Sequence, residues 1–232
     1  MFDVILWDVD NTLLDFLAAE RQSLMDAFAH FCLGPCPEDR VARYSKLNAS
    51  YWKRLEKGEI TKAELLPGRF REFFQQEGIV FDDPQAVSDF YQIRLGENAI
   101  PQDDSLTLVA SLKGRVRQYA VTNGTKVAQQ RKLSGSGLDK LLDGVFISEE
   151  VGVEKPGIGF FQKVWETIGT YAPDEVMIVG DSLTSDIRGG NNAGIVTCWF
   201  NPQEAATPDG IRIDYEIRNL AEVITILCPA GN

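Results

Sequence analysis

Histidine and cysteine are scarce in this chain, and their scarcity excludes several kinds of catalytic site. The 232 residues include one histidine, His30, so a Ser–His or Cys–His nucleophile could exist only if His30 itself served in it. Of the four cysteines, only Cys32 and Cys36 lie close together, without a second cysteine pair or a suitable histidine for zinc. We therefore expect free thiols, and a His30 that packs on a helix or lies at the surface.

Positive charge and long apolar runs are lacking as well. The chain carries 23 Lys and Arg against 34 Asp and Glu, a formal net charge of −11, which gives no electrostatic footprint for nucleic acid polymers. No run of about 18 apolar residues could span a membrane, and no signal segment opens the sequence. We expect a soluble cytoplasmic protein whose partner is small, since a small anion could still bind in a local positive pocket.

Short apolar runs recur along the chain with helical stretches between them, which predicts an α/β fold. Strands that alternate with helices form right-handed βαβ units and a parallel sheet. The expected strands are Val4–Trp7, Gln118–Val121, Gly144–Ile147, Val176–Val179 and Val196–Trp199, with a weaker sixth at Asp214–Ile217.

The interval between the first two expected strands is nearly all helical, with Gly and Pro signals between the helices. The expected helices are Leu17–Phe31, Pro37–Lys57, Thr61–Gln76 and Pro84–Glu97. Four helices exceed an ordinary crossover between neighbouring strands. We therefore expect an inserted, all-helical domain at residues 16–97, while residues 1–15 and 98–232 form the domain that contains the sheet.

Asp8 and Asp10 directly follow the first expected strand. In open α/β sheets, ligands collect at the carboxyl ends of the strands. If a divalent cation offsets the repulsion between two such carboxylates, one can attack an electrophile while the other moves a proton. Asp and Asn are also ordinary turn residues, so this spacing by itself leaves a catalytic site and a turn equally open.

Polar side chains follow three further strands. Thr122 and Asn123 come after the second, Lys155 lies beyond the third and is held extended by the proline after it, and Asp181 and Asp186 follow the fourth. Each has an ordinary alternative as a turn residue, a solvated lysine or a helix cap. Their joint occurrence at the ends of consecutive strands favours one site. Carboxylates, a hydroxyl and an ammonium suit phosphoryl transfer assisted by Mg²⁺.

In this order the motifs resemble those of the haloacid dehalogenase-like (HAD) hydrolase superfamily, over nearly the whole chain. The matching segments are Asp8–Thr12, Thr122–Gly124, Lys155–Pro156 and Gly180–Asp186. The resemblance implies a Rossmann-like catalytic core with a helical cap inserted between the first and second motifs.

The resemblance also implies catalytic roles for the first two aspartates. Asp8 would be the nucleophile that forms an aspartyl-phosphate. Asp10 would protonate the leaving oxygen and then deprotonate the water that attacks the phosphoenzyme. Similar dehalogenases and phosphonatases lack an aspartate at the position of Asp10, so its presence favours hydrolysis of phosphate esters. A phosphomutase remains a minor alternative.

Binding roles follow from the same resemblance. The phosphoryl group would be bound by the side chains of Thr122 and Lys155, with help from the backbone N–H of Asn123. Mg²⁺ would be held by the Asp8 carboxylate, the Asp10 carbonyl and Asp181, while Asp186 would ligate through water or orient the site.

Substrate choice is expected to depend on the helical cap, which closes over the leaving group. We expect residues near Phe16, Trp52 and the segment Gly58–Arg69 to line the pocket. The nearby aromatic residues are expected to pack the cap helices instead; they are Phe70, Phe73 and Phe74.

Segments of the cap and core resemble a bacterial subgroup of 5′-nucleotidases that act on pyrimidine monophosphates. The segments are Tyr51–Phe70, Ile147–Gly152 and Thr197–Asn201. Two alternatives stay open. One is a phosphatase for another small metabolite, such as phosphoglycolate or a sugar phosphate. The other is a binding module without catalytic activity, which the completeness of the motifs disfavours.

Overall fold

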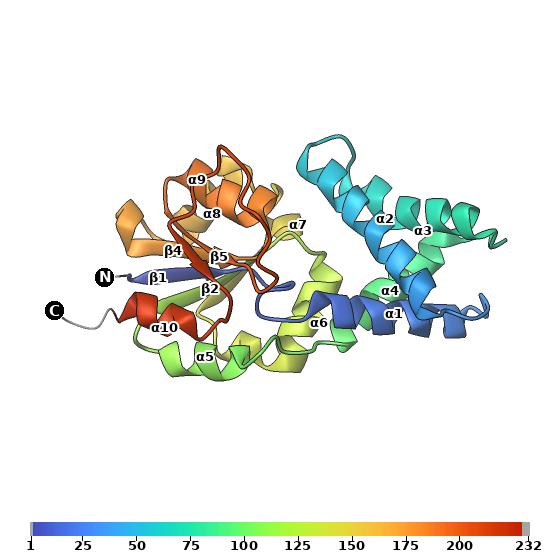
Figure 1. The fold of residues 1–232 in the computed structure, drawn as a ribbon, viewed down its shortest axis with the longest axis horizontal. Helices are drawn as coiled ribbons and strands as arrows, with labels where there is room; N and C mark the ends of the chain where they lie inside the picture. Colours follow the sequence, from blue (N-terminus) through green and yellow to red (C-terminus); the bar gives the residue numbers. More distant parts are fainter. Residues whose placement is uncertain (1, 229–232) are drawn as a thin grey trace.

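A six-stranded sheet forms the centre of the larger lobe in the computed structural model, which describes residues 2–228 (Figure 1). The strand order is β3-β2-β1-β4-β5-β6, and every neighbouring pair is parallel. The strands are β1 (Val4–Trp7), β2 (Arg117–Thr122), β3 (Gly144–Ile147), β4 (Val176–Gly180), β5 (Val196–Phe200) and β6 (Tyr215–Ile217). The predicted α/β fold with a parallel sheet is confirmed, including its weak sixth strand.

Both faces of the sheet are covered by helices, which explains why β1 reads as a continuous apolar run. Ile5 and Trp7 point into one hydrophobic core with α5 and α10, whereas Val4 and Leu6 point into another with α8. The core helices are α5 (Ser105–Leu112), α6 (Lys126–Ser136), α7 (Ser148–Val151), α8 (Ile158–Ile168), α9 (Arg188–Ala193) and α10 (Glu222–Leu227). Short 3₁₀ turns cover Leu138–Lys140 and Pro173–Glu175, and a π-helical turn covers Leu183–Ile187.

Four helices between β1 and β2 form the cap: α1 (Phe16–His30), α2 (Glu38–Glu56), α3 (Lys62–Glu77) and α4 (Pro84–Glu97). Local sequence signals fix their ends. The side chains of Asp15 and Asp83 cap α1 and α4, and Thr61 forms a capping box with Glu64 at the start of α3. Gly78 ends α3 at a φ of 66°, a conformation that favours glycine.

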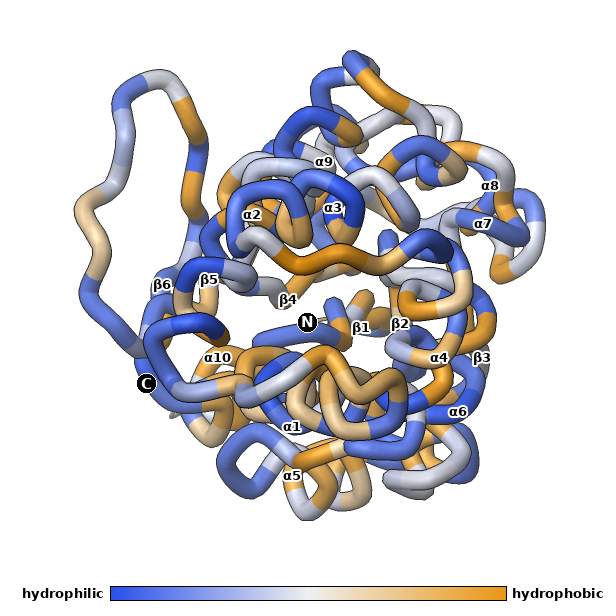
Figure 2. The backbone as a smooth tube through the Cα atoms, turned by 90° about the vertical axis from the view of Figure 1, so that its right-hand side faces the viewer, coloured by the Kyte–Doolittle hydropathy of each residue, from blue (hydrophilic) through white to orange (hydrophobic). Residues whose placement is uncertain are grey.

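The cap has a hydrophobic core of its own, dominated by aromatic rings. Phe70, Phe73 and Phe74 are buried in it together with Phe28 and Tyr44, so the prediction that they pack the helices is confirmed. In the view from the cap side, α2 and α3 lie above the line of β1 and β2, and α1 and α4 lie below it (Figure 2). The cap helices therefore flank the carboxyl ends of the strands. We propose residues 16–97 as the cap domain.

The single histidine and the four cysteines have ordinary structural surroundings. His30 is exposed at the end of α1 and stacks on Phe90, with 4.2 Å between ring centroids. The four cysteines are free. Within residues 2–228, no helix combines the length and the apolar character that crossing a membrane requires.

Candidate active site

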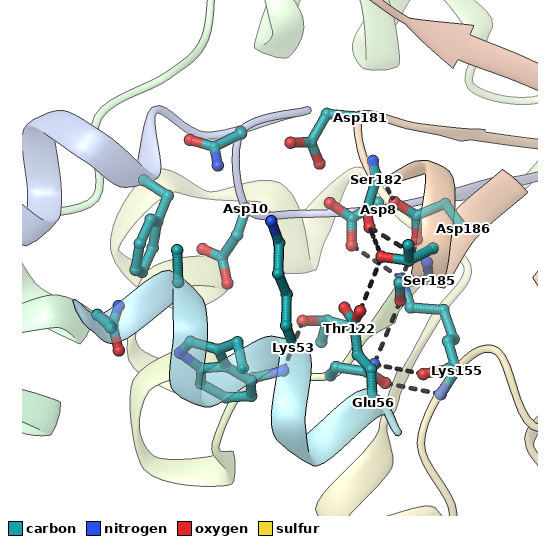
Figure 3. A pocket seen from close by; sticks show the side chains of 18 of the residues that line it. Asp8, Asp10, Lys53, Glu56, Thr122, Lys155, Asp181, Ser182, Ser185 and Asp186 are labelled. Carbon is teal, nitrogen blue, oxygen red and sulfur yellow. Dashed lines mark hydrogen bonds and ion pairs between the residues drawn. The ribbon is translucent and has the colours of Figure 1, made fainter. Parts of the chain in front are cut away.

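A cavity of about 340 Å³ lies between the carboxyl ends of the strands and the cap (Figure 3). All seven residues predicted for the site line it: Asp8, Asp10, Thr122, Asn123, Lys155, Asp181 and Asp186. The cap contributes the remaining wall, mainly through Phe16, Glu20, Ser45, Asn48, Trp52, Lys53 and Glu56. Residues far apart in the sequence thus meet in one cavity.

Lys155 is at the centre of the site. Its ammonium donates to Asp8 Oδ1 at 2.9 Å and to the Val121 carbonyl at 2.7 Å, and it pairs with Asp186 Oδ1. Only 1% of the lysine is exposed. Burial by itself lowers the pKa of Lys155, but Asp186 and Asp8 raise it above its usual value. The lysine therefore stays charged and holds both carboxylates in place.

Three carboxylates surround this single ammonium. Oxygens of Asp8, Asp181 and Asp186 all lie within 4.8 Å of one another. Burial and the charge of Asp186 raise the pKa of Asp8 to about 7, and burial and the charge of Asp8 raise the pKa of Asp181. These raised pKa values show that the single ammonium of Lys155 does not offset the repulsion among three carboxylates. Clustered carboxylate oxygens of this kind fit a hard divalent cation such as Mg²⁺.

Asp186 is fixed through both of its oxygens. Oδ1 pairs with Lys155, and Oδ2 accepts from the Ser182 backbone N–H at 3.1 Å. Asp186 can lie here because Gly180, which it contacts, has no side chain. A Cβ added to Gly180 would lie 2.4 Å from Asp186 Cγ, much closer than such atoms can approach. The glycine at the end of β4 is therefore required for the placement of Asp186.

Gly180→Ala is expected to lower any catalytic activity of this site by at least about tenfold, because displacing Asp186 moves Lys155 and Asp8 with it. It should also lower the free energy of unfolding by about 1–3 kcal/mol through overpacking. Steady-state rates and thermal melts measure both effects. Gly135→Ala is the matched control, since an added Cβ there meets nothing within 4 Å. A fully active Gly180→Ala enzyme would show that the close approach does not matter.

The side chain of Asn123 bonds to the backbone of Lys155 and is not free to contact a phosphate. Its Nδ2 donates to the Lys155 carbonyl and its Oδ1 accepts from the Lys155 backbone N–H, both at 2.8 Å. The amide thus holds the backbone that carries the central lysine. The backbone N–H of Asn123 remains the predicted phosphate contact. Thr122 is buried beside it, with Oγ1 accepting from the Gly124 N–H at 3.1 Å.

Asp10 has two partners that the sequence analysis did not identify. Gln129 Nε2 donates to Asp10 Oδ2 at 2.6 Å, and the buried ammonium of Lys132 pairs with Oδ1. Both partners are on α6, spaced three residues apart and therefore on the same face. The usable signal in the sequence was a polar pair at helical spacing directly after Thr122–Gly124.

Two side chains of the cap, Glu56 and Lys62, form hydrogen bonds with the core near the cavity. Thr184 Oγ1 donates to Glu56 Oε2 at 2.7 Å. Lys62 Nζ donates to the Asn123 carbonyl at 3.0 Å and to Ser148 Oγ at 2.9 Å. Both contacts connect helices of the cap to loops that carry predicted site residues.

Predictions for the cap wall are confirmed in part. Phe16 and Trp52 line the cavity, but among the described residues the segment Gly58–Arg69 contributes nothing to its lining. That part of the prediction is wrong because the segment mainly packs within the cap, and Lys62, which reaches the core, lies outside the lining. Leu65 is buried against α2, and Arg69 lies inside the aromatic core of the cap.

Known proteins share both the sequence and the fold. HAD-hydrolase YfnB of Bacillus subtilis is 35% identical over 97% of this chain and 95% of its own length. A magnesium-bound crystal structure of YfnB covers 97% of this chain and 98% of its own, with a TM-score of 0.92. L-2-haloacid dehalogenase from Xanthobacter autotrophicus shares the fold, with a TM-score of 0.79 at 18% identity.

Two relatives confirm the resemblance to the nucleotidase subgroup. Pyrimidine 5′-nucleotidase PynA of Streptococcus pneumoniae is 33% identical over 97% of this chain and 95% of its own length. Pyrimidine 5′-nucleotidase YjjG of Escherichia coli is 31% identical over 98% of both chains. The profile of haloacid dehalogenase-like hydrolases matches residues 2–194, which include every predicted site residue. The chain therefore belongs to the haloacid dehalogenase-like hydrolase family.

Proposed function

We propose that this enzyme is a Mg²⁺-dependent phosphomonoesterase that works through an aspartyl-phosphate on Asp8. The observation that carries the proposal is that two carboxylates, those of Asp8 and Asp10, line one cavity and have different hydrogen-bond partners. Asp8 is fixed by Lys155 through Oδ1, and Asp10 is fixed from α6. A nucleophile and a separate proton donor are what a two-step ester hydrolysis requires.

In the first step, an oxygen of Asp8 forms a bond to phosphorus while the bond from phosphorus to the leaving oxygen breaks. Asp10 gives its proton to that leaving oxygen. In the second step, Asp10 takes a proton from water as the water oxygen attacks phosphorus, and the bond to Asp8 breaks. Inorganic phosphate leaves and both aspartates return to their starting states. Lys155 and Thr122 bind the phosphoryl oxygens throughout.

The cation would be held by the carboxylates of Asp8 and Asp181 and by the Asp10 carbonyl. Both oxygens of Asp186 are already engaged, which supports a role for Asp186 through water or in orientation. When bound, Mg²⁺ would neutralise charge on the phosphoryl group. The repulsion among the clustered carboxylates and the magnesium in the YfnB structure support this assignment.

Pyrimidine nucleoside 5′-monophosphates are the proposed substrates. The similarity to PynA and YjjG over nearly the whole chain, cap included, supports this choice. A phosphatase for phosphoglycolate or a sugar phosphate is the second candidate, because the core chemistry would be the same.

Phosphate release from a substrate panel tests both the reaction and the substrate. With Mg²⁺ present, we expect UMP and dTMP to be hydrolysed with a higher kcat/KM than purine monophosphates, sugar phosphates or phosphoglycolate. EDTA should abolish release from all of them. Release from a sugar phosphate alone would agree with the proposed mechanism but contradict pyrimidine monophosphates as the substrates. Conversion of one sugar phosphate to an isomer without free phosphate would favour a mutase.

A further inference from the structure

A buried glutamate on the cap side of the cavity has no part in the proposed phosphoryl chemistry. Glu20, on the first turns of α1, lines the cavity although only 1% of it is exposed. Asn48 and Ser45 of α2 line the cavity beside it. Asn48 Nδ2 donates to Glu20 Oε1 at 2.7 Å. A buried carboxylate is costly unless it is paired and bonded, so its surroundings should explain its presence.

A balancing positive charge comes from Arg69, deep in the cap, which contacts Asn48 rather than Glu20 itself. Arg69 Nη1 donates to Asn48 Oδ1 at 2.7 Å, and its guanidinium lies 5.0 Å from the centre of the Tyr91 ring. Arg69 is fully buried. Because Asn48 must turn its oxygen to Arg69, its NH₂ necessarily faces Glu20. The three side chains form a fixed relay that orients the carboxylate of Glu20.

The carboxylate of Glu20 can accept further hydrogen bonds from a ligand. A carboxylate can accept about four hydrogen bonds, and within residues 2–228 Asn48 is the side chain that donates one to Glu20. Burial raises the pKa of Glu20, while the nearby charges of Arg69 and Lys132 lower it. Lys132 is the lysine that pairs with Asp10. The Lys132 ammonium also lies 5.1 Å from the centre of the Phe16 ring, one turn before Glu20 on α1. This end of α1 thus lies on the side of the cavity where Asp10 would meet the leaving group.

We infer that Glu20 is a specificity-determining residue that accepts a hydrogen bond from an N–H or O–H group of the leaving alcohol, and that Asn48 and Arg69 position it. The inference rests on the proposed function. It names the substrate class as esters of a neutral, donor-bearing alcohol, such as a nucleoside. A leaving group with its own carboxylate at this place would be repelled, which disfavours phosphoglycolate.

Glu20→Gln provides a sharp test because the relay fixes how the new amide must turn. Asn48 still presents its NH₂, so the carbonyl oxygen of the amide faces Asn48 and its NH₂ faces the cavity. The amide NH₂ then faces the N–H or O–H group of the leaving alcohol, and two donors cannot form a hydrogen bond. For UMP we expect kcat/KM to fall at least about tenfold, the effect of losing a hydrogen bond to a charged group. For p-nitrophenyl phosphate, whose leaving group has no such donor, kcat/KM should be unchanged.

Glu59→Gln, at an exposed position of the cap outside the cavity, is the matched control and should leave both substrates unaffected. Thermal melts check that Glu20→Gln folds. Calorimetry with uridine measures leaving-group binding without catalysis, and Glu20→Gln should weaken it about as much as it lowers kcat/KM for UMP. Equal losses on both esters, or unchanged UMP hydrolysis and uridine binding, would overturn the inference. If no ester is hydrolysed by the wild-type enzyme, the proposed function fails, while uridine binding still tests Glu20.

Discussion

Asp8→Asn is expected to reduce phosphate release by at least about 10⁴-fold, since losing a nucleophile removes the covalent route. The side chain keeps its size, and Lys155 keeps its bonds to Asp186 and the Val121 carbonyl. The loss should therefore be catalytic rather than structural. It is measured as kcat for UMP and for p-nitrophenyl phosphate, and it should be large for both because each needs the same attack on phosphorus.

Thermal melts separate this loss from unfolding. Asp8 lies close to Asp181 and Asp186, so the amide relieves repulsion between like charges while it gives up one ion pair. We expect a folded variant with a melting temperature near that of the wild type. Asp3→Asn, at an exposed position just before β1, is the control and should be fully active. An Asp8→Asn enzyme with substantial activity would contradict a covalent role for Asp8.

Asp10→Asn is expected to slow UMP hydrolysis by about 10²–10⁴-fold, the usual contribution of a general acid–base. Its effect should depend on the leaving group. Nitrophenolate leaves without a proton, so the first step with p-nitrophenyl phosphate should be nearly unaffected. The second step still needs a base, so the phosphoenzyme should accumulate.

A rapid-mixing experiment checks this prediction. Asp10→Asn should give a burst of nitrophenol close to one equivalent per enzyme, followed by a slow steady rate. The wild type, whose Asp10 serves both steps, should give no such separation. Equal slowing of the burst and the steady rate for p-nitrophenyl phosphate would show that Asp10 does not act as the base of a second step.

The sheet and the core of the site could be predicted from the sequence because both depend on local pattern. A strand covered on both faces is continuously apolar, as Val4–Trp7 is. Because the strands are parallel, the residues that follow them lie together at the carboxyl-terminal edge of the sheet. Asp8, Lys155 and Asp186 were therefore predictable as neighbours, although they are far apart in the chain.

The relay of Glu20, Asn48 and Arg69 could not be predicted in this way. Its members come from three different helices, and their meeting depends on how α1, α2 and α3 pack. Arg69 in particular was expected at the end of a segment that lines the pocket, yet it is fully buried among aromatic rings. Helix packing in the cap is set by side-chain shape, which periodicity does not encode.

The covalent step on Asp8 is the central claim, and mass spectrometry of the Asp10→Asn enzyme tests it most directly. The enzyme would be mixed with p-nitrophenyl phosphate and Mg²⁺, quenched in acid within the burst, and analysed intact and after proteolysis. We expect the protein to gain the mass of one phosphoryl group, located on the peptide that contains Asp8. A nitrophenol burst with no phosphorylated protein, or a phosphoryl group on another residue, would contradict the account.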